Sequence, residues 1–232
     1  MRSYIRLTVG LALLCAAMST ASFASSMYIV QGLAGRNYSA DTNPAFPLDL
    51  LLNDEVCYVH GLPFGNIQGP LTFFPGSYDV KVSIANTLAP CSNSPLIDTT
   101  VKIGAESDIS AVIALDSTGI PTLVTFTNNL IPVPANGSRL LFAQTVSSTT
   151  VQVIVQNLST KKLSTYNVKP GALLDVNLPA GAYTVSVNQG TTTLVESTPE
   201  FLNSQSVTLL YAIGEASNST VVLASRILRD VI

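Results

Sequence analysis

The sequence predicts an all-β protein in which a signal peptide precedes two tandem antiparallel β-sandwich domains. Three observations favour this fold class. Several segments alternate apolar and polar residues with a period of two, which is typical of strands with one solvated face. Charged residues make up only 11% of the chain, while Val, Thr and Ile, which strands prefer, are abundant. Finally, similar segments recur about a hundred residues apart.

The N-terminus has the layout of a secretory signal peptide. Arg2 and Arg6 provide a positive start, an apolar run covers residues 7–18, and Ser22-Phe23-Ala24 places small residues at the −3 and −1 positions of a cleavage site. A membrane anchor needs roughly 20 apolar residues, so this run is too short for one. We therefore predict a signal peptide over residues 1–24, cleaved near Ala24, a secreted or periplasmic location, and no transmembrane segment in the mature chain.

The charge of the predicted mature chain argues against some classes of partner. The chain has 11 basic and 14 acidic residues, and removal of Arg2 and Arg6 leaves 9 basic residues and a net charge of −5. Binding to nucleic acid depends on Lys and Arg contacts to phosphate, so we expect no nucleic-acid partner. The same acidic balance disfavours an anionic membrane surface.

Two of the three cysteines, Cys57 and Cys91, lie in the predicted mature chain. An even pair in a secreted chain indicates one disulfide. It would close a loop of 34 residues and stabilise the fold by about 3–4 kcal/mol if its effect is mainly on the unfolded chain. A reactive thiol or a metal pair is the alternative, and the chain has only one histidine to support it.

The predicted strands are read from the alternation of side chains. Four segments show it: Leu48–Asn53, Gly76–Ser83, Val151–Gln156 and Gly181–Asn188. In the first of these, Leu48, Leu50 and Leu52 face the core, and Asp49 falls on the polar face. The run Ile109–Leu115 is continuously apolar apart from Ser110 and is typical of a buried strand.

The two halves of the chain repeat one module. Two stretches match in the same order: Gly76–Val82 with Gly181–Val187 at an offset of 105, and Asp108–Leu115 with Ser206–Ile213 at an offset of 98. Solenoid repeats have periods of roughly 20–50 residues, so a repeat this long indicates a domain duplication. The alignment pairs Tyr78 with Tyr183, which we expect to be inward anchors that follow a turn glycine.

A segment rich in Pro, Asn and Gly separates the two modules. It covers Asn128–Ser138, where two prolines restrict the backbone. We therefore predict a first domain over residues 27–129, a linker over 130–138 and a second domain over 139–232.

Short motifs occur in a consistent order along both modules. In the first module they are Val30–Gly35, Pro47–Asp54, Leu62–Gly65, Pro75–Tyr78 and Gly119–Thr122, and the clearest in the second are Pro179–Tyr183 and Tyr211–Gly214. This order resembles the domain of unknown function 4397, a family of secreted and cell-envelope bacterial β-sandwich modules with no agreed activity. The family often carries a histidine in its opening motif, where this chain has Gln31 and Gln144, so a role tied to that histidine has no matching residue here.

Candidate catalytic and metal-binding residues are few. His60 is the only histidine, and zinc or copper sites usually need several imidazoles or thiolates, so we interpret it as a partly buried loop histidine. Ser159–Lys162 matches the S-x-x-K pattern of catalytic Ser–Lys dyads. It falls in an expected hairpin connection, where polar residues are common, so we do not interpret it as catalytic. Asp54-Glu55 and the pair Glu106 and Asp108 form no EF-type calcium loop, so we interpret them as solvated turn acids.

We therefore predict that the protein is not an enzyme and has no catalytic residue, cofactor or metal. The leading hypothesis is a secreted or periplasmic protein of two immunoglobulin-like or transthyretin-like sandwiches. It would serve in binding, adhesion or envelope structure through loops at the sandwich ends, with a protein or glycan partner at the cell surface. The alternative is an accessory domain or hydrolase that acts on cell-wall or extracellular polysaccharide.

Overall fold

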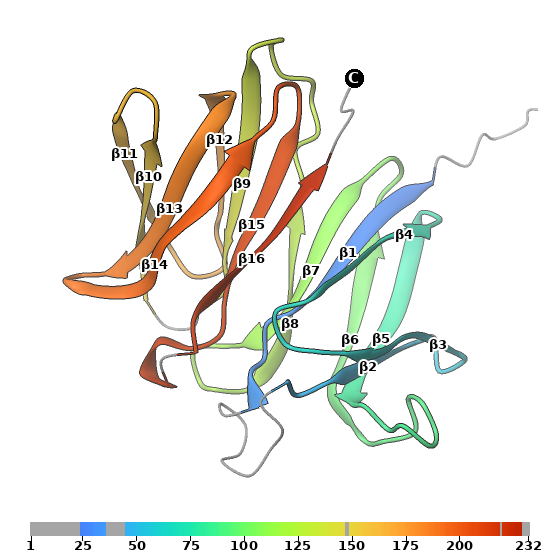
Figure 1. Ribbon diagram of the computed structural model, residues 1–232. Helices are drawn as coiled ribbons and strands as arrows, with labels where there is room; N and C mark the ends of the chain where they lie inside the picture. Colours follow the sequence, from blue (N-terminus) through green and yellow to red (C-terminus); the bar gives the residue numbers. More distant parts are fainter. Residues whose placement is uncertain (1–23, 36–44, 147–148, 219, 229–232) are drawn as a thin grey trace, which may run out of the picture.

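The computed structural model of the chain describes residues 24–35, 45–146, 149–218 and 220–228. These residues form 16 strands in four sheets of four strands each, with one short 3-10 helix, η1 (Ala216–Asn218) (Figure 1). Residues 1–23 of the predicted signal peptide lie outside the described residues. The predicted fold class, two tandem antiparallel β-sandwiches, is confirmed.

The first eight strands form one sandwich. Its inner sheet contains, in spatial order, β4 (Ile67–Phe73), β1 (Ser25–Gln31), β7 (Asp108–Leu115) and β8 (Pro121–Thr127). Its outer sheet contains β3 (Val56–Leu62), β2 (Leu48–Leu52), β5 (Gly76–Ile84) and β6 (Pro95–Ile103).

The last eight strands repeat this arrangement in the second sandwich. Its inner sheet contains β12 (Leu173–Pro179), β9 (Gly137–Gln144), β15 (Val207–Ile213) and β16 (Val222–Leu228). Its outer sheet contains β11 (Leu163–Val168), β10 (Val151–Asn157), β13 (Gly181–Gln189) and β14 (Thr192–Leu202). The register is also repeated, because Leu52 pairs with Val80 and Val155 pairs with Val185 at the corresponding place.

The strand order distinguishes between the two sandwich types that the sequence left open. In each inner sheet the first strand of the module pairs in parallel with the seventh, as β1 does with β7 and β9 with β15. The orders 4-1-7-8 and 3-2-5-6 depart from the immunoglobulin order, whose sheets are A-B-E-D and C-F-G. Of the two alternatives, the transthyretin-like one remains.

Strands β7 and β15 are buried on both faces, and this burial joins the two sandwiches. In β15, Leu210 and Ala212 face the core of the second sandwich, whereas Leu209 and Tyr211 face the first sandwich. The corresponding side chains of the inner sheet of the first sandwich include Tyr28, Val30 and Val112. The two inner sheets thus pack face to face and form a third apolar core, which we call the central interface (Figure 1).

A short polar chain crosses the central interface. The Tyr211 hydroxyl lies 2.6 Å from the Ser110 hydroxyl, and Ser110 donates its own proton to Oδ1 of Asn128 at 2.9 Å. Tyr211 is therefore the donor to Ser110. Asn128 in turn donates to the Asp108 carboxylate at 2.6 Å. Burial raises the pKa of Asp108 above its ordinary value, and the hydrogen bond from Asn128 acts in the opposite direction.

The segment between the sandwiches is held to the second one by Arg139. Nη1 of this buried arginine donates to the backbone oxygens of Asn129, at 3.1 Å, and Ile131, at 2.6 Å. Its Nε lies 3.2 Å from the Asp175 carboxylate, and Val133 is buried nearby in the same segment. The connection is thus fixed by specific contacts in addition to its prolines.

Candidate functional site

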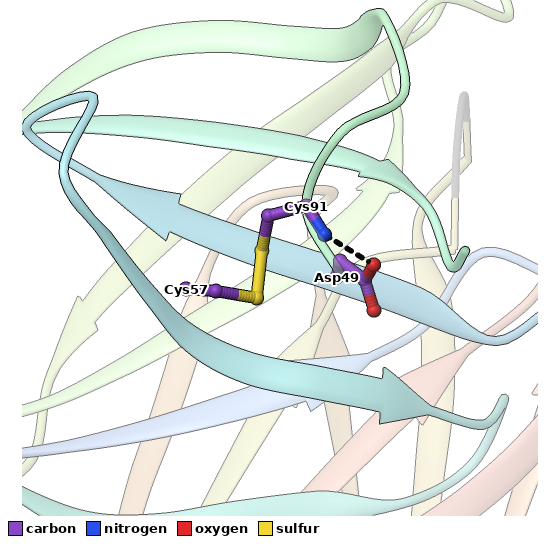
Figure 2. A group of neighbouring side chains, drawn as sticks. All are labelled: Asp49, Cys57 and Cys91. Atoms are coloured by element: carbon purple, nitrogen blue, oxygen red, sulfur yellow. Dashed lines mark hydrogen bonds between the residues drawn. A yellow bond between two sulfur atoms is a disulfide. The ribbon is translucent and has the colours of Figure 1, made fainter. Parts of the chain in front are cut away.

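The predicted disulfide between Cys57 and Cys91 is confirmed. Cys57 lies in β3, and Cys91 lies in the long loop between β5 and β6, with the two Cα atoms 5.7 Å apart. The bond therefore fastens the β5–β6 loop to an edge strand of the outer sheet (Figure 2).

Asp49 lies beneath this loop with its side chain fully buried, which corrects the expectation that it faces solvent. Oδ1 accepts hydrogen bonds from Nδ1–H of His60 at 2.7 Å and from the backbone N–H of Gly61 at 2.9 Å. Oδ2 accepts from the backbone N–H group of Cys91 at 2.8 Å (Figure 2) and from that of Asn86 at 3.1 Å. The β5–β6 loop covers what would otherwise be the wet face of β2.

The hydrogen bonds determine the ionisation of Asp49. Burial alone would raise the pKa of this carboxyl. The backbone donors of Cys91, Gly61 and Asn86, together with His60, outweigh that effect and hold the pKa of Asp49 below its ordinary value of 3.8. Asp49 is therefore ionised, and its hydrogen bonds connect β2 with β3 and with the β5–β6 loop.

These residues do not form a metal site. Ligand atoms of Asp49, Cys57 and Cys91 lie within 4.8 Å of one another. However, the two sulfur atoms are bonded to each other, and metal ligation by cysteine needs a thiolate. His60 lies in β3 instead of the loop that the sequence predicted, and its side chain is 44% exposed.

Loss of the disulfide is expected to destabilise the first sandwich. A variant with Cys57→Ser and Cys91→Ser should have a free energy of unfolding about 3–4 kcal/mol lower than the wild type, because the 34-residue loop is freed in the unfolded chain. Urea denaturation measures the difference. Reductant should shift the wild type but leave the double variant unchanged, and free thiols in the unreduced protein would contradict the assignment.

Gln31 and Gln144, which stand where the family often has histidine, have structural roles. Both are fully buried at the ends of β1 and β9. The side-chain oxygen of Gln31 accepts from the N–H of Leu33 at 2.8 Å, and that of Gln144 accepts from the N–H of Val146 at 3.0 Å. The Gln31 amide also donates to the Phe46 carbonyl at 2.7 Å. Each glutamine therefore fixes the backbone conformation of the residues that follow the first strand of its module.

Each sandwich has a cavity at the end that carries its first hairpin turn. The volumes are about 190 Å³ in the first sandwich and about 240 Å³ in the second. Four lining positions correspond in the two copies: Leu52 and Val155, Phe73 and Leu178, Phe74 and Pro179, and Tyr78 and Tyr183. The Tyr78 hydroxyl donates to the carbonyl of Phe74 at 2.8 Å, and that of Tyr183 donates to the carbonyl of Pro179 at 2.8 Å. The duplication has therefore produced the same cavity twice.

Around the first cavity lies an exposed apolar surface, which we call the first patch. Val56, Tyr58 and Phe74 line this cavity and are exposed, and the Phe74 side chain is 63% accessible. The turn between β2 and β3 adds Asp54 and Glu55, of which Glu55 lines the cavity. Exposed apolar groups gathered around a hollow are typical of an interaction surface.

The first patch has an acidic border. Lys81 Nζ lies 2.6 Å from the carboxylate of Asp54, 3.9 Å from that of Asp79 and 3.8 Å from that of Asp98. One ammonium group thus forms ion pairs with three carboxylates. Glu55 makes no ion pair with the described residues. The β2–β3 turn itself thus carries two carboxylates and no lysine.

A second patch lies around the second cavity. Leu158, in the turn between β10 and β11, and Leu163, the first residue of β11, are exposed, and the turn also carries Lys161 and Lys162. Lys162 lines the cavity, and neither lysine pairs with a carboxylate in the part of the chain that the structure describes. The β10–β11 turn beside the second cavity is therefore basic, whereas the β2–β3 turn beside the first is acidic.

The remaining predicted candidates do not come together as a catalytic set. The Ser159–Lys162 segment is the β10–β11 turn, as the sequence predicted, and Asn157 Oδ1 accepts from the N–H groups of Ser159 and Thr160. Asp54 forms an ion pair at the surface, whereas Asp108 lies beside Asn128 at the central interface. The interpretation of Asp108 as a solvated turn acid is therefore wrong, because β7 is buried on both faces.

Sequence reasoning did not find the Asp49 cluster or the paired cavities. The Asp49 cluster could have been predicted from the cysteine pair. A disulfide from Cys91 to β3 must bring the β5–β6 loop across Asp49. The repeated Tyr78 and Tyr183 pointed to the paired cavities. The alternation of residues in their strands, however, indicated only that these two side chains face inward.

Comparisons with known proteins give one family match. A family model described as a domain of unknown function (DUF4397) matches residues 37–156, which are 120 of the 232 residues. Among curated proteins none matches. A solved structure described as the Bacillus anthracis TIE protein is similar over 83% of this chain and 34% of that chain, with 13% sequence identity and a TM-score of 0.28. This chain thus spans about a third of that protein's length.

Proposed function

The chain belongs to the DUF4397 family, and from that premise we propose that it is a non-catalytic binding or structural module of the cell envelope. It is secreted or periplasmic and acts through surfaces at the ends of its sandwiches. Its partner is a protein or glycan.

The observation that carries this proposal is the repeated patch. The exposed Phe74 lines the first cavity, and the exposed Leu158 and Leu163 lie at the β10–β11 turn, from which Lys162 lines the corresponding second cavity. Soluble proteins seldom gather exposed apolar groups around a hollow unless the surface contacts a partner.

Two further features support the proposed location. The Cys57–Cys91 disulfide is of the kind that persists in oxidising compartments. The predicted signal peptide over residues 1–24 would direct the chain there. Among the residues that the structure describes, none belongs to a helix with the length and hydropathy that a membrane crossing requires.

Site-specific crosslinking in intact cells tests the proposal. A photoreactive benzoyl-phenylalanine placed at Phe74 or at Leu163 should give adducts with envelope protein or glycan, because these side chains lie in the patches. The matched control is Leu88, which is 95% exposed but lies in the β5–β6 loop at the other end of the first sandwich. Equal labelling at Leu88, or no adduct at either patch, would contradict the proposal.

The enzyme alternative gives a separate result. Turnover of a cell-wall or extracellular polysaccharide by the purified protein, lost on a Glu55→Gln or Asp108→Asn substitution, would contradict the non-catalytic part of the proposal.

A further inference from the structure

The two patches occupy corresponding places in the duplicated fold, but their charges are opposite. Glu55 lines the first cavity and follows Asp54 in the β2–β3 turn, whereas Lys162 lines the second cavity and follows Lys161 in the β10–β11 turn. Each is the first hairpin turn of its module, so the same position carries carboxylates in one copy and ammonium groups in the other.

The two patches also differ in shape in a complementary way. The first patch presents Phe74, which is 63% exposed. The second patch presents the larger cavity, about 240 Å³, whose apolar wall is formed by Val155, Leu178, Pro179 and Tyr183. A large aromatic side chain that enters an apolar pocket is a common anchor of protein interfaces.

The patches cannot meet within one molecule. The β2–β3 turn and the β10–β11 turn lie on opposite sides of the molecule in Figure 1, with the inner sheets and the central interface between them. A contact between the two patches must therefore join two molecules.

We propose that the partner of each patch is a second copy of this chain, with the first patch of one molecule seated on the second patch of the next. Phe74 enters the Tyr183 cavity of its neighbour, while Asp54 and Glu55 face Lys161 and Lys162. The inference rests on the proposed function, because it names the partner of the same surfaces. The contact joins two different surfaces, so each added molecule leaves one patch of each kind free, and the assembly grows head to tail.

Charge reversal tests the proposed pairing. Sedimentation of the wild type should show an average mass that rises with protein concentration beyond that of a dimer. Glu55→Lys and Lys162→Glu should each weaken self-association by about a hundredfold, because each substitution places like charges opposite one another. The double variant with both substitutions should associate again, because the opposite charges are restored with their positions exchanged.

Mixing the single variants tests the direction of the contact. Alone, each single variant should remain a monomer at concentrations where the wild type associates. An equimolar mixture should associate, because the ammonium group introduced by Glu55→Lys then faces the carboxylate introduced by Lys162→Glu. The unaltered Glu55 of the second variant likewise faces the unaltered Lys162 of the first. Phe74→Ser should also abolish association, and Leu88→Ser, its matched control, should not.

Three results would overturn the proposal. These are a wild type that stays monomeric up to millimolar concentration, association that survives Phe74→Ser, and single variants that are not rescued by mixing or by the double substitution. If self-association fails while the Phe74 and Leu163 positions still crosslink to another envelope component, the head-to-tail proposal is wrong and the proposed function stands. If those positions do not crosslink to any molecule, both are wrong.

Discussion

Replacement of Tyr211 with alanine is expected to lower the free energy of unfolding by about 4–5 kcal/mol. Tyr211 is only 2% exposed and lies in the central interface, where its ring fills space between the two inner sheets. Its loss leaves a cavity and removes the donor to Ser110. The wild type should unfold in one cooperative transition because the two sandwiches share this core, whereas the variant should unfold in two steps.

Tyr211→Phe is the matched control. It keeps the ring and removes only the hydroxyl, so it should lower the free energy of unfolding by about 1 kcal/mol and keep a single transition. Urea denaturation followed by circular dichroism and by tyrosine fluorescence measures both variants. Two separate transitions in the wild type, or an alanine variant as stable as the phenylalanine variant, would show that the central interface does not couple the sandwiches.

Replacement of Asp49 with alanine is expected to lower the free energy of unfolding by about 5 kcal/mol at neutral pH, the upper end of the cost of breaking a buried charged network. Three backbone N–H groups, of Gly61, Asn86 and Cys91, and the His60 ring donate to this buried carboxylate. Hydrogen bonds to a charged acceptor are worth about 1.5–3 kcal/mol each, and donors left buried without an acceptor add a further cost. Asp49→Asn keeps the shape but turns an NH₂ group toward the donors, so it should lose most of the same stability.

The effect of pH provides an independent measure of the Asp49 cluster. The pKa of Asp49 in the folded protein lies below its ordinary value of 3.8, so the ionised group contributes its full stability above that pH. The contribution is lost as the pH falls through the lower value of the folded state. The difference in stability between the wild type and Asp49→Asn should therefore be large at about pH 7 and smaller at about pH 3. A difference that does not change over this range would contradict the proposed ionisation of Asp49.

Local sequence patterns predicted the strands β2, β5, β7, β10 and β13, but not what packs against the inner sheets. Alternation placed Val80 and Val185 correctly toward the cores, because a strand with one wet face shows its period directly. The apolar run in β7 indicated a buried strand, and β15 reads in the same way. A continuous apolar run shows that both faces are covered, but it does not show what covers them. The central interface therefore appeared only in the structure.

The site residues illustrate the same limit. Asp49 occupies a position where alternation predicts solvent, but a loop more than thirty residues further along the chain covers it. Such burial depends on a tertiary contact, which the disulfide pairing indicated and the local pattern did not. Tyr78 and Tyr183 were recognised as repeated inward anchors, yet the cavities beside them depend on the side chains of several different strands and turns.

The long β5–β6 loop distinguishes the first copy of the duplicated fold from the second. Ten residues separate β5 from β6, whereas two residues separate the corresponding β13 and β14. The second copy has no cysteine, none of its described acidic residues is buried, and the partly exposed Gln152 stands at the position of Asp49. Ordering a longer loop costs conformational entropy, which the disulfide and the carboxylate offset. The longer loop, the two cysteines and Asp49 thus depend on one another in the first copy, and deletion of the loop down to a two-residue turn would leave Cys57 without its partner and Asp49 without two of its four donors.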